Sequence, residues 1–280
     1  MVDLHIHSRA SDGSDSIKEL LEKVRGAGIS VFSLTDHDTI DGISEMEKMV
    51  PDDMRFIRGI EFTSITEAGK CHILGYDYDS CSEDFCAILK ESIRHRKNKT
   101  EKRIAFLESE FGISLTEEEL SDIRGKSSVE KPYFGNLLVS KGYAKDKKEA
   151  IKKYLDPCKT DDYRLEGRRV IEAILAAGGI PVWAHPFGGT DEDEVSVPDF
   201  EKQLKVLTKA GLRGLECYYS KYTKEQVEML LGFAEENGLC VSGGSDYHGK
   251  NKKVALGTLN AFGMKVTEDK LTVLDAIMSQ

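Results

Sequence analysis

The chain lacks the features that mark membrane, secreted and zinc-finger proteins. No apolar run approaches the roughly 20 residues of a membrane-spanning helix, and the six cysteines form no CxxC pair. The N-terminus does not resemble a signal peptide, because Asp3 and two histidines interrupt its first residues. We therefore expect no membrane segment, no disulfide scaffold and no cysteine-rich zinc finger. The expected protein is cytoplasmic, with reduced and mostly buried thiols.

The chain also has fewer basic than acidic residues: 39 Lys and Arg against 49 Asp and Glu, which gives a formal net charge of -10. General binding to a nucleic-acid backbone requires neutralisation of many phosphates, so this balance disfavours it while leaving room for a local basic pocket. No glycine-rich phosphate loop and no internal repeat occurs. With 280 residues and 40% hydrophobic composition, the chain can bury a large core as one barrel-sized domain or as two smaller domains.

Short apolar runs alternate with amphipathic segments along most of the chain. Residues 2–7 alternate like a strand, and Ser16 with Glu19 forms a capping box for a helix that ends near 26–28. The pattern predicts further strands at 29–34, 54–62, 180–183, 212–218 and 239–242, and helices at 42–49, 168–177, 199–210 and 224–237. The run 71–78 is either the next strand or half of a hairpin. Repeated strand and helix units indicate a parallel sheet or barrel, in which ligand-binding residues gather at the carboxyl ends of strands.

The stretch 83–166 differs in character, because it is rich in Lys and Glu and places apolar residues such as Ile93, Ile104 and Leu107 at helical spacing. We interpret it as an inserted helical subdomain. Residues 1–82 and 167–280 would then form the barrel. The sole tryptophan, Trp183, is expected in the barrel core.

Six of the seven histidines lie in short polar motifs that follow apolar runs; only His95 stands apart. The motifs are Asp3-Leu4-His5-Ile6-His7, Thr35-Asp36-His37-Asp38, Cys71-His72, Ala184-His185-Pro186 and Ser245-Asp246-Tyr247-His248. Imidazole and carboxylate are the ligands that zinc, manganese and iron share. This distribution predicts a multi-metal site.

Taken in order, these motifs resemble the PHP family of metal-dependent phosphoesterases over nearly the whole chain. The likeness also rests on Ser11-Asp12-Gly13, Gly59-Ile60-Glu61 and the sequence His72-x-Leu74-Gly75-Tyr76. It is greatest for a subgroup with a helical insertion, whose members release phosphate from nucleoside 3',5'-bisphosphates or mononucleotides, and some of which shorten RNA from a 5'-phosphate. The resemblance implies an α/β fold, a distorted (β/α)7 TIM-like barrel with an inserted α-helical subdomain, and a trinuclear metal centre.

The resemblance also implies how the ligands divide among three metals. The first metal would take His5, His7, Glu61 and Asp246; the second Asp12, His37 and His248; and the third Glu61, His72 and His185, so that Glu61 bridges. A Ser-Asp-Gly turn would equally explain Asp12. Asp3, Asp36 and Asp38 are expected to orient the imidazoles from behind.

Two departures from the family concern the substrate. Phe187-Gly188-Gly189 follows the His-Pro pair where relatives often have an arginine, and Glu130-Lys131-Pro132-Tyr133 stands where they have Thr-Arg-Pro-His. Lys131 keeps the charge but lacks the planar fork that grips a phosphate. The likeness implies substrate contacts from Lys131 and from His95, Arg96 and Lys97, although a solvated surface explains these residues equally well.

The sequence thus predicts a metal-dependent phosphoric ester hydrolase that acts on phosphomonoesters of small nucleotides, of the AMP or nucleoside 3',5'-bisphosphate type, through a metal-activated hydroxide. The alternatives are a 5'-3' exonuclease on short oligonucleotides, a non-nucleotide phosphatase such as a histidinol phosphatase, and a non-catalytic metal-stabilised domain. Family likeness favours three manganese ions, while the ligand types admit zinc and iron alike. The expected partner is a small phosphorylated substrate, without a membrane.

Overall fold

Seven strands form the wall of a barrel in the computed structural model, which describes residues 1–160, 164–190 and 193–279. The strands, in their order around the barrel, are β1 (Val2–Ile6), β2 (Val31–Leu34), β3 (Arg55–Thr66), β4 (Gly69–Tyr76), β6 (Ile180–Ala184), β7 (Gly214–Tyr219) and β8 (Cys240–Gly244). A two-residue strand, β5 (Leu165–Glu166), pairs with β3 outside this order.

The barrel closes where β1 meets the segment after β8. Ile6 and Tyr247 form a parallel bridge. The Asp246 N–H donates to the His5 carbonyl at 2.8 Å, and the His7 N–H donates to the Tyr247 carbonyl at 2.9 Å. Closure therefore joins the first and last histidine motifs. The predicted distorted barrel is confirmed.

The run 71–78, for which the sequence left open the next strand or half of a hairpin, forms half of a hairpin. β4 runs antiparallel to both β3 and β6, so β3 and β4 form a hairpin across the short turn between Thr66 and Gly69. A two-residue connection cannot return the chain for a parallel pairing, which requires a crossover of a dozen or more residues. His72 consequently lies in the amino half of its strand, and the reversal of β4 brings it to the same end of the barrel as the carboxyl ends of its neighbours.

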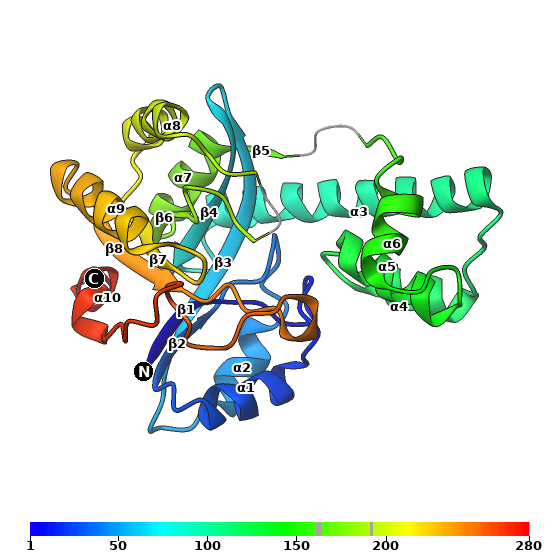
Figure 1. Cartoon of the computed structure of the whole chain (residues 1–280), viewed down its shortest axis with the longest axis horizontal. Helices are drawn as coiled ribbons and strands as arrows, with labels where there is room; N and C mark the ends of the chain where they lie inside the picture. The colour runs from blue at the N-terminus through cyan, green and yellow to red at the C-terminus, as the bar shows by residue number, and fades with distance from the viewer. Residues whose placement is uncertain (161–163, 191–192, 280) are drawn as a thin grey trace.

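Helices surround the barrel on its outside (Figure 1). They are α1 (Ile17–Gly26), α2 (Ile43–Met49), α7 (Gly167–Ala176), α8 (Val197–Ala210), α9 (Lys224–Glu236) and α10 (Val273–Met278). The capping box of α1 is present as predicted, because the Ser16 side chain accepts from the Glu19 N–H while the Glu19 side chain accepts from the Ser16 N–H. Trp183 is buried in the main core and stacks on Phe200, as expected.

A long helix, α3 (Glu83–Phe111), leaves the barrel and carries a group of shorter helices near its far end (Figure 1). These are α4 (Glu117–Gly125), α5 (Lys131–Ser140), α6 (Lys147–Ala150) and the π-helical turn η1 (Ile151–Leu155). They have a hydrophobic cluster of their own, which includes Leu107, Phe134 and Tyr154. The division into a barrel and an insertion at 83–166 stays a prediction, and residues 161–163 of that range lie outside the described residues.

The remaining expectations concern membranes and thiols. Among the described residues, no helix has both the length and the apolar character needed to cross a bilayer. All six cysteines are free thiols, but only Cys71 and Cys217 are buried, so the expectation that most are buried is wrong. The short 3₁₀ turns η2 (Gly249–Asn251) and η3 (Glu268–Lys270) complete the elements.

Candidate metal centre and its pocket

The nine predicted ligands lie together at one end of the barrel. Most follow strands directly: the set is His5 in β1, His7 just after it, Asp12 in the next loop, His37 after β2, Glu61 in β3, His72 in β4, His185 after β6, and Asp246 and His248 after β8. Seven of the nine are buried, and Asp12 and His72 are partly exposed. Residues more than 240 positions apart in sequence thus share one cluster.

Glu61 stands at the middle of this cluster. Its Oε2 lies 3.2 Å from His5 Nε2, from His7 Nε2 and from His37 Nδ1. Its Oε1 lies 3.0 Å from His72 Nδ1 and 3.0 Å from His185 Nε2. One carboxylate oxygen therefore faces three imidazoles and the other faces two. This is the placement that a carboxylate shared between two cations requires.

A second carboxylate gathers the ligands on the other side. Asp12 Oδ1 lies 3.0 Å from His248 Nε2 and 3.7 Å from His7 Nδ1. Donor atoms of His7, Asp12, His37 and His248 all lie within 4.8 Å of one another. His7 therefore faces two groups, with one ring nitrogen toward Glu61 and the other toward Asp12, whereas the family likeness assigned it to a single metal.

The donor atoms fit divalent cations. His7 Nδ1, His37 Nδ1 and His248 Nε2 are buried and, although each lies 3.0 to 3.7 Å from a carboxylate oxygen, none makes a hydrogen bond of regular geometry with the described residues. A buried polar atom without a hydrogen bond calls for a specific explanation, and a bound ion is one. His5 Nε2 and His7 Nε2 also approach within 3.0 Å, with carboxylate oxygens beside them. Imidazole nitrogens and carboxylate oxygens that converge in this way match the ligand chemistry of zinc, manganese and iron.

The charges of the ligands show how the carboxylates and imidazoles are coupled. Although burial opposes ionisation, the imidazoles that surround Glu61 hold its pKa well below its usual range. Burial also opposes charge on His7, but hydrogen bonds with Asp246 and Glu61 raise its pKa to about 9. Burial lowers the pKa of His37 to about 3, so this ring is neutral and offers a lone pair. Metal binding would therefore displace protons from the cluster, since ligand atoms bind metals in their deprotonated form.

The acidic residues that the sequence placed behind the imidazoles have other roles. Asp3 accepts backbone N–H groups of His5, Ser245 and Gly257. Asp36 accepts the hydroxyls of Ser8 and Ser11, and Asp38 binds Arg96 and the Thr63 N–H. None of the three makes a hydrogen bond with a ring nitrogen of a histidine in the described chain. The expectation that they orient imidazoles is therefore wrong; they brace the ligand loops instead.

Glu216 performs the orienting role, and the sequence reasoning missed it. This fully buried residue of β7 binds His5 Nδ1 through Oε1 at 2.9 Å and accepts the His185 N–H through Oε2 at 2.7 Å. The first of these bonds fixes the ring so that Nε2 faces Glu61. The only signal in the sequence is an acidic residue in the middle of the apolar run 212–218, where an unpartnered charge would be costly.

We expect Glu216→Gln to weaken metal binding about 10- to 100-fold, the effect typical of losing a group that orients a metal-ligating histidine. A glutamine keeps the shape of the side chain but removes the charge that favours the Nδ1–H tautomer of His5. Metal titration followed by calorimetry measures the change. The exposed Glu201→Gln of α8 serves as the control, and equal metal affinity in both variants would contradict the role of Glu216.

Asp246 is held by groups from two neighbouring segments. Its Oδ2 accepts from the Tyr219 hydroxyl at 2.8 Å and from Lys252 Nζ at 2.7 Å, which leaves Oδ1 facing His7 at 3.4 Å. The backbone is strained here, because Asp246 and His185 have φ angles of 57° and 28°. Non-glycine residues seldom adopt these values, and such strain concentrates at functional sites.

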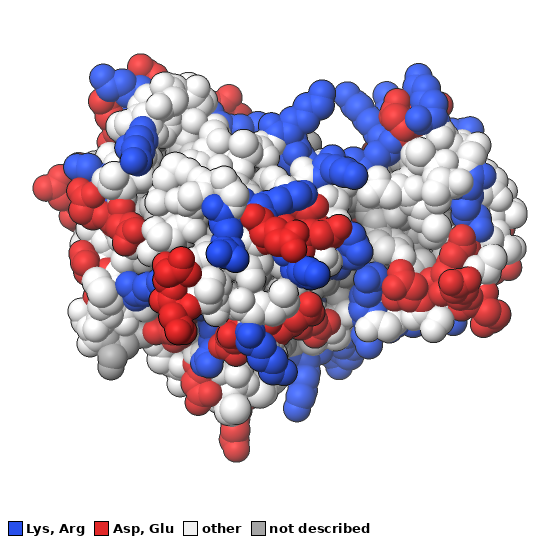
Figure 2. Space-filling view, turned by 90° about the horizontal axis from the view of Figure 1, so that it is seen from below, with Lys and Arg blue, Asp and Glu red and all other residues white. Residues whose placement is uncertain are grey.

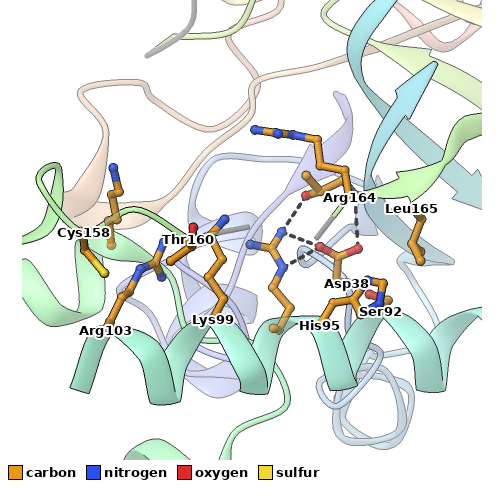
Figure 3. Close-up of a pocket in the computed structure, with 12 residues that line it drawn as sticks. Asp38, Ser92, His95, Lys99, Arg103, Cys158, Thr160, Arg164 and Leu165 are labelled. Carbon is orange, nitrogen blue, oxygen red and sulfur yellow. Dashed lines mark hydrogen bonds and ion pairs between the residues drawn. The ribbon is translucent and has the colours of Figure 1, made fainter. Parts of the chain in front are cut away.

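A cavity of about 260 Å³ lies between α3 and the barrel beside the metal cluster, and cations dominate its lining. Figure 3 shows Lys99 and Arg103 rising from α3 and Arg164 entering from the chain before β5. This cation pocket, lined by Arg96, Lys99, Arg103, Lys131 and Arg164, is contiguous with the cavity over the metal cluster, which Arg96, Lys99 and Arg164 also line.

Three of the four predicted substrate contacts line the cation pocket, and one does not. His95, Arg96 and Lys131 line the cation pocket, whereas Lys97 is exposed and lines a separate hollow on another face of α3. Arg96 is buried and bound by two carboxylates, Asp38 and Glu130, with a further hydrogen bond to Thr63 at 2.5 Å. Lys131 pairs with Asp156 at 2.6 Å. Arg96 therefore joins the loop after His37 to the insertion.

Lys99, Arg103 and Arg164 are pocket residues that the sequence reasoning missed. Burial, together with Arg96 and Arg103, lowers the pKa of Lys99 to about 7. Arg96, Lys99 and Arg103 are spaced three and four residues apart, so their shared helix face was a readable signal. Arg164 and Lys252 lie in polar stretches where nothing singles them out. A cluster of cations that repel one another provides a favourable site for an anion.

Comparison with known proteins agrees with this geometry. The family model of the PHP domain matches residues 3–169. A 5'-3' exoribonuclease from Haemophilus influenzae is 32% identical, with 88% of this chain and 89% of that protein covered. A 3',5'-nucleoside bisphosphate phosphatase from Chromobacterium violaceum is 26% identical, with 88% and 87% covered.

A solved structure is similar over almost its entire length. It comes from Bifidobacterium adolescentis and is described as a metal-dependent phosphoesterase. It is 26% identical to this chain, covers 99% of this chain and 95% of its own, and superposes with a TM-score of 0.82. The chain therefore belongs to the PHP family of metal-dependent phosphoesterases and is a hydrolase of phosphoric esters.

Proposed function

We propose that this protein hydrolyses a phosphomonoester of a small nucleotide that carries a second phosphate, with a nucleoside 3',5'-bisphosphate as the preferred type. The observation that carries the proposal is the cation pocket beside the metal cluster. One phosphate would lie at the metals and the other in the pocket. A mononucleotide such as AMP would occupy only one of the two positions.

The charge balance of the cation pocket supports a second phosphate. Among the residues that the structure describes, five cationic side chains line it, and Asp38 is the single acidic residue of the lining. Asp38 is already paired with Arg96. Among the described residues, Lys99 forms no ion pair, and Arg103, which is 2% exposed, has Glu130 as its one acidic partner at 4.0 Å. A phosphate dianion would relieve this repulsion, and arginine matches its oxygens through two parallel hydrogen bonds.

The ligand residues would hold three divalent cations, for which manganese is proposed. The three groups of ligands are those that the family likeness implies. His7 lies beside two of these groups, because one of its ring nitrogens faces Glu61 and the other faces Asp12. When bound, such cations supply an activated water and hold the phosphoryl oxygens. The side chains of this chain do the rest: Glu61, Asp12 and Asp246 offset the positive charge of the ions, while Glu216 and Lys252 fix the ligands that they contact.

A second candidate, 5'-3' exonuclease action on short oligonucleotides, is favoured by the relative with 32% identity, which is named a 5'-3' exoribonuclease. The pocket would then hold the terminal 5'-phosphate while a phosphodiester lies at the metals. Both candidates use the same second-phosphate position. They differ in whether the phosphate at the metals is esterified on one side or on both.

The proposal predicts that a second phosphate improves catalysis and that Lys99 recognises it. With manganese, we expect kcat/KM for adenosine 3',5'-bisphosphate to exceed that for 3'-AMP or 5'-AMP. Lys99→Met should lower kcat/KM for the bisphosphate about 10- to 100-fold, because a hydrogen bond to a charged group contributes about 1.5–3 kcal/mol. The monophosphates should be unaffected. Phosphate release measures all of these values, with histidinol phosphate as a non-nucleotide comparison.

Lys97→Met is the matched control, since Lys97 lies two positions away on α3 but outside the cation pocket. The preference should also depend on pH. Because the pKa of Lys99 is lowered to about 7, raising the pH above 7 removes the proton that phosphate binding requires. The affinity for the bisphosphate should therefore decline above pH 7 in the wild type more steeply than in Lys99→Met. Equal turnover of bisphosphate and monophosphate would contradict the proposal.

A further inference from the structure

A second basic cavity borders the metal cluster at Asp12 and His248, and it shares Lys131 with the cation pocket. It has a volume of about 700 Å³ and lies between the barrel and the helical run α6–η1. Five lysines line it, Lys131, Lys147, Lys148, Lys152 and Lys252, and we call it the lysine groove. Figure 2 shows Lys and Arg side chains gathering where the barrel meets these helices, with acidic side chains to either side.

The lysine groove is continuous with the metal cluster. The predicted ligands Asp12 and His248 form part of its wall, and Lys252 lines both the groove and the cavity over the metals. The cation pocket meets that cavity at Arg96, Lys99 and Arg164 instead. The metal cluster therefore borders two basic cavities, which meet the cavity over the metals at different residues and also share Lys131. A ligand that reaches all three must carry negative charge at three successive positions.

Two lysines of the groove are available for such a ligand. Lys147 donates to the Asn251 carbonyl at 2.8 Å, Lys131 pairs with Asp156, and Lys252 pairs with Asp246. Lys148 and Lys152 are exposed and form no ion pair within the described chain. They lie four residues apart on one face of the α6–η1 run, where like charges repel each other. The repulsion between these two lysines lies at the edge of the metal cluster, where a bound anion would remove it.

A nucleoside bisphosphate does not account for the lysine groove, because its two phosphates are already placed at the metals and in the cation pocket. A nucleotide chain would account for it. If the phosphate at the metals is a diester, the chain continues beyond the scissile bond, and its next phosphate can reach the groove, which adjoins the cluster at Asp12 and His248. The volume of the groove falls within the range typical of ligand sites, so it has room for the following nucleotide.

We propose that the lysine groove binds the backbone of an oligonucleotide beyond the scissile phosphate, with Lys148 and Lys152 contacting the third phosphate from the 5' end. The inference rests on the second-phosphate position of the proposed function. Hydrolysis would add water to the phosphodiester phosphorus and break its bond to the preceding 3' oxygen, which takes up a proton. The shortened chain keeps the new 5'-phosphate, and the first nucleotide leaves as its 5'-monophosphate.

The test compares substrates that do or do not reach the groove. The metal-loaded full chain is assayed with adenosine 3',5'-bisphosphate, the dinucleotide pApA and the trinucleotide pApApA. The double variant Lys148→Gln/Lys152→Gln should raise KM several-fold for pApApA and leave the other two substrates unchanged. Lys145→Gln/Lys153→Gln is the charge-matched control, since both lysines are exposed and lie outside the groove.

Binding provides a readout that is independent of turnover. Fluorescence anisotropy follows a labelled 5'-phosphorylated hexanucleotide with phosphorothioate linkages. The plot of log binding constant against log salt should become shallower by about 0.7 in the groove variant, because the two lysines together neutralise the third phosphate and one single-strand phosphate contributes about 0.7 to the slope. Equal binding by the groove variant and the control would overturn the proposal that the lysine groove binds the oligonucleotide backbone, whether or not the bisphosphate is hydrolysed. Loss of binding in the groove variant alone, with no hydrolysis of the bisphosphate, sustains the groove and overturns the proposed function.

Discussion

Replacing Glu61 with glutamine should reduce phosphate release by roughly a thousandfold or more, above the usual loss for one electrostatic group at an active centre. The reason is geometric. Each oxygen of Glu61 faces a different set of imidazoles, at distances of 3.0 to 3.2 Å, so one substitution alters the environment of both sets. Glutamine keeps the size but removes the negative charge and places an NH₂ where a lone pair is needed. Steady-state kinetics with saturating manganese measures the loss.

Glu67→Gln is the control for this change, because Glu67 is exposed at the turn between β3 and β4. It should leave turnover unchanged. Circular dichroism of Glu61→Gln should show the wild-type fold, since the strand pairing of β3 does not depend on this side chain. Turnover of Glu61→Gln near that of wild type, with its fold intact, would refute the proposed centre.

Metal should also stabilise the folded protein strongly. Ligands from β1, β3, β4 and the segments after β2, β6 and β8 meet at the cluster, and the unfolded chain cannot present this arrangement. A ligand present at 100 times its dissociation constant adds about 2.7 kcal/mol to the free energy of unfolding. For a chain of 280 residues that corresponds to a rise in Tm of roughly 5 °C.

Calorimetry of chelator-treated protein with and without added manganese tests this expectation, and zinc and iron(II) extend the comparison. Activity should disappear with the chelator and return with metal. The rise in Tm should be smaller in Glu61→Gln and unchanged in Glu67→Gln. A Tm that does not respond to any of the three metals would show that the cluster does not hold them in the folded state.

The fold was accessible from the sequence wherever one segment carried its own signal. Ser16 and Glu19 defined the start of α1, and alternating or apolar runs defined β1, β2, β6 and β7, because local hydrogen bonding and hydrophobic periodicity depend on neighbours in the chain. The direction of β4 was not accessible in the same way. The apolar run 71–78 is compatible with either direction, and only pairing with β3 and β6 settles it.

The same distinction applies to the candidate centre: residues with a local sequence signal were found, and residues defined by distant partners were missed. Its nine proposed ligands were readable because imidazoles and carboxylates at strand ends are rare unless they have chemical work to do, and the order of the motifs carried the family likeness. Glu216 was missed because its partner, His5, is 211 residues away. The roles of Asp3, Asp36 and Asp38 were misjudged because proximity in sequence to a ligand does not determine which donor a carboxylate meets.

The sequence by itself determined the family, the barrel of alternating strands and helices, and the chemical type of the centre, since these depend on residue types and on their order. Only the tertiary structure decided which cations surround the centre. Lys99, Arg103 and Arg164 become one pocket, and Lys148, Lys152 and Lys252 one groove, because α3 and α6 are packed beside the barrel. A lysine in a polar stretch looks the same in sequence whether it faces bulk water or an active centre, because its local pattern is identical and only distant segments remove its solvent.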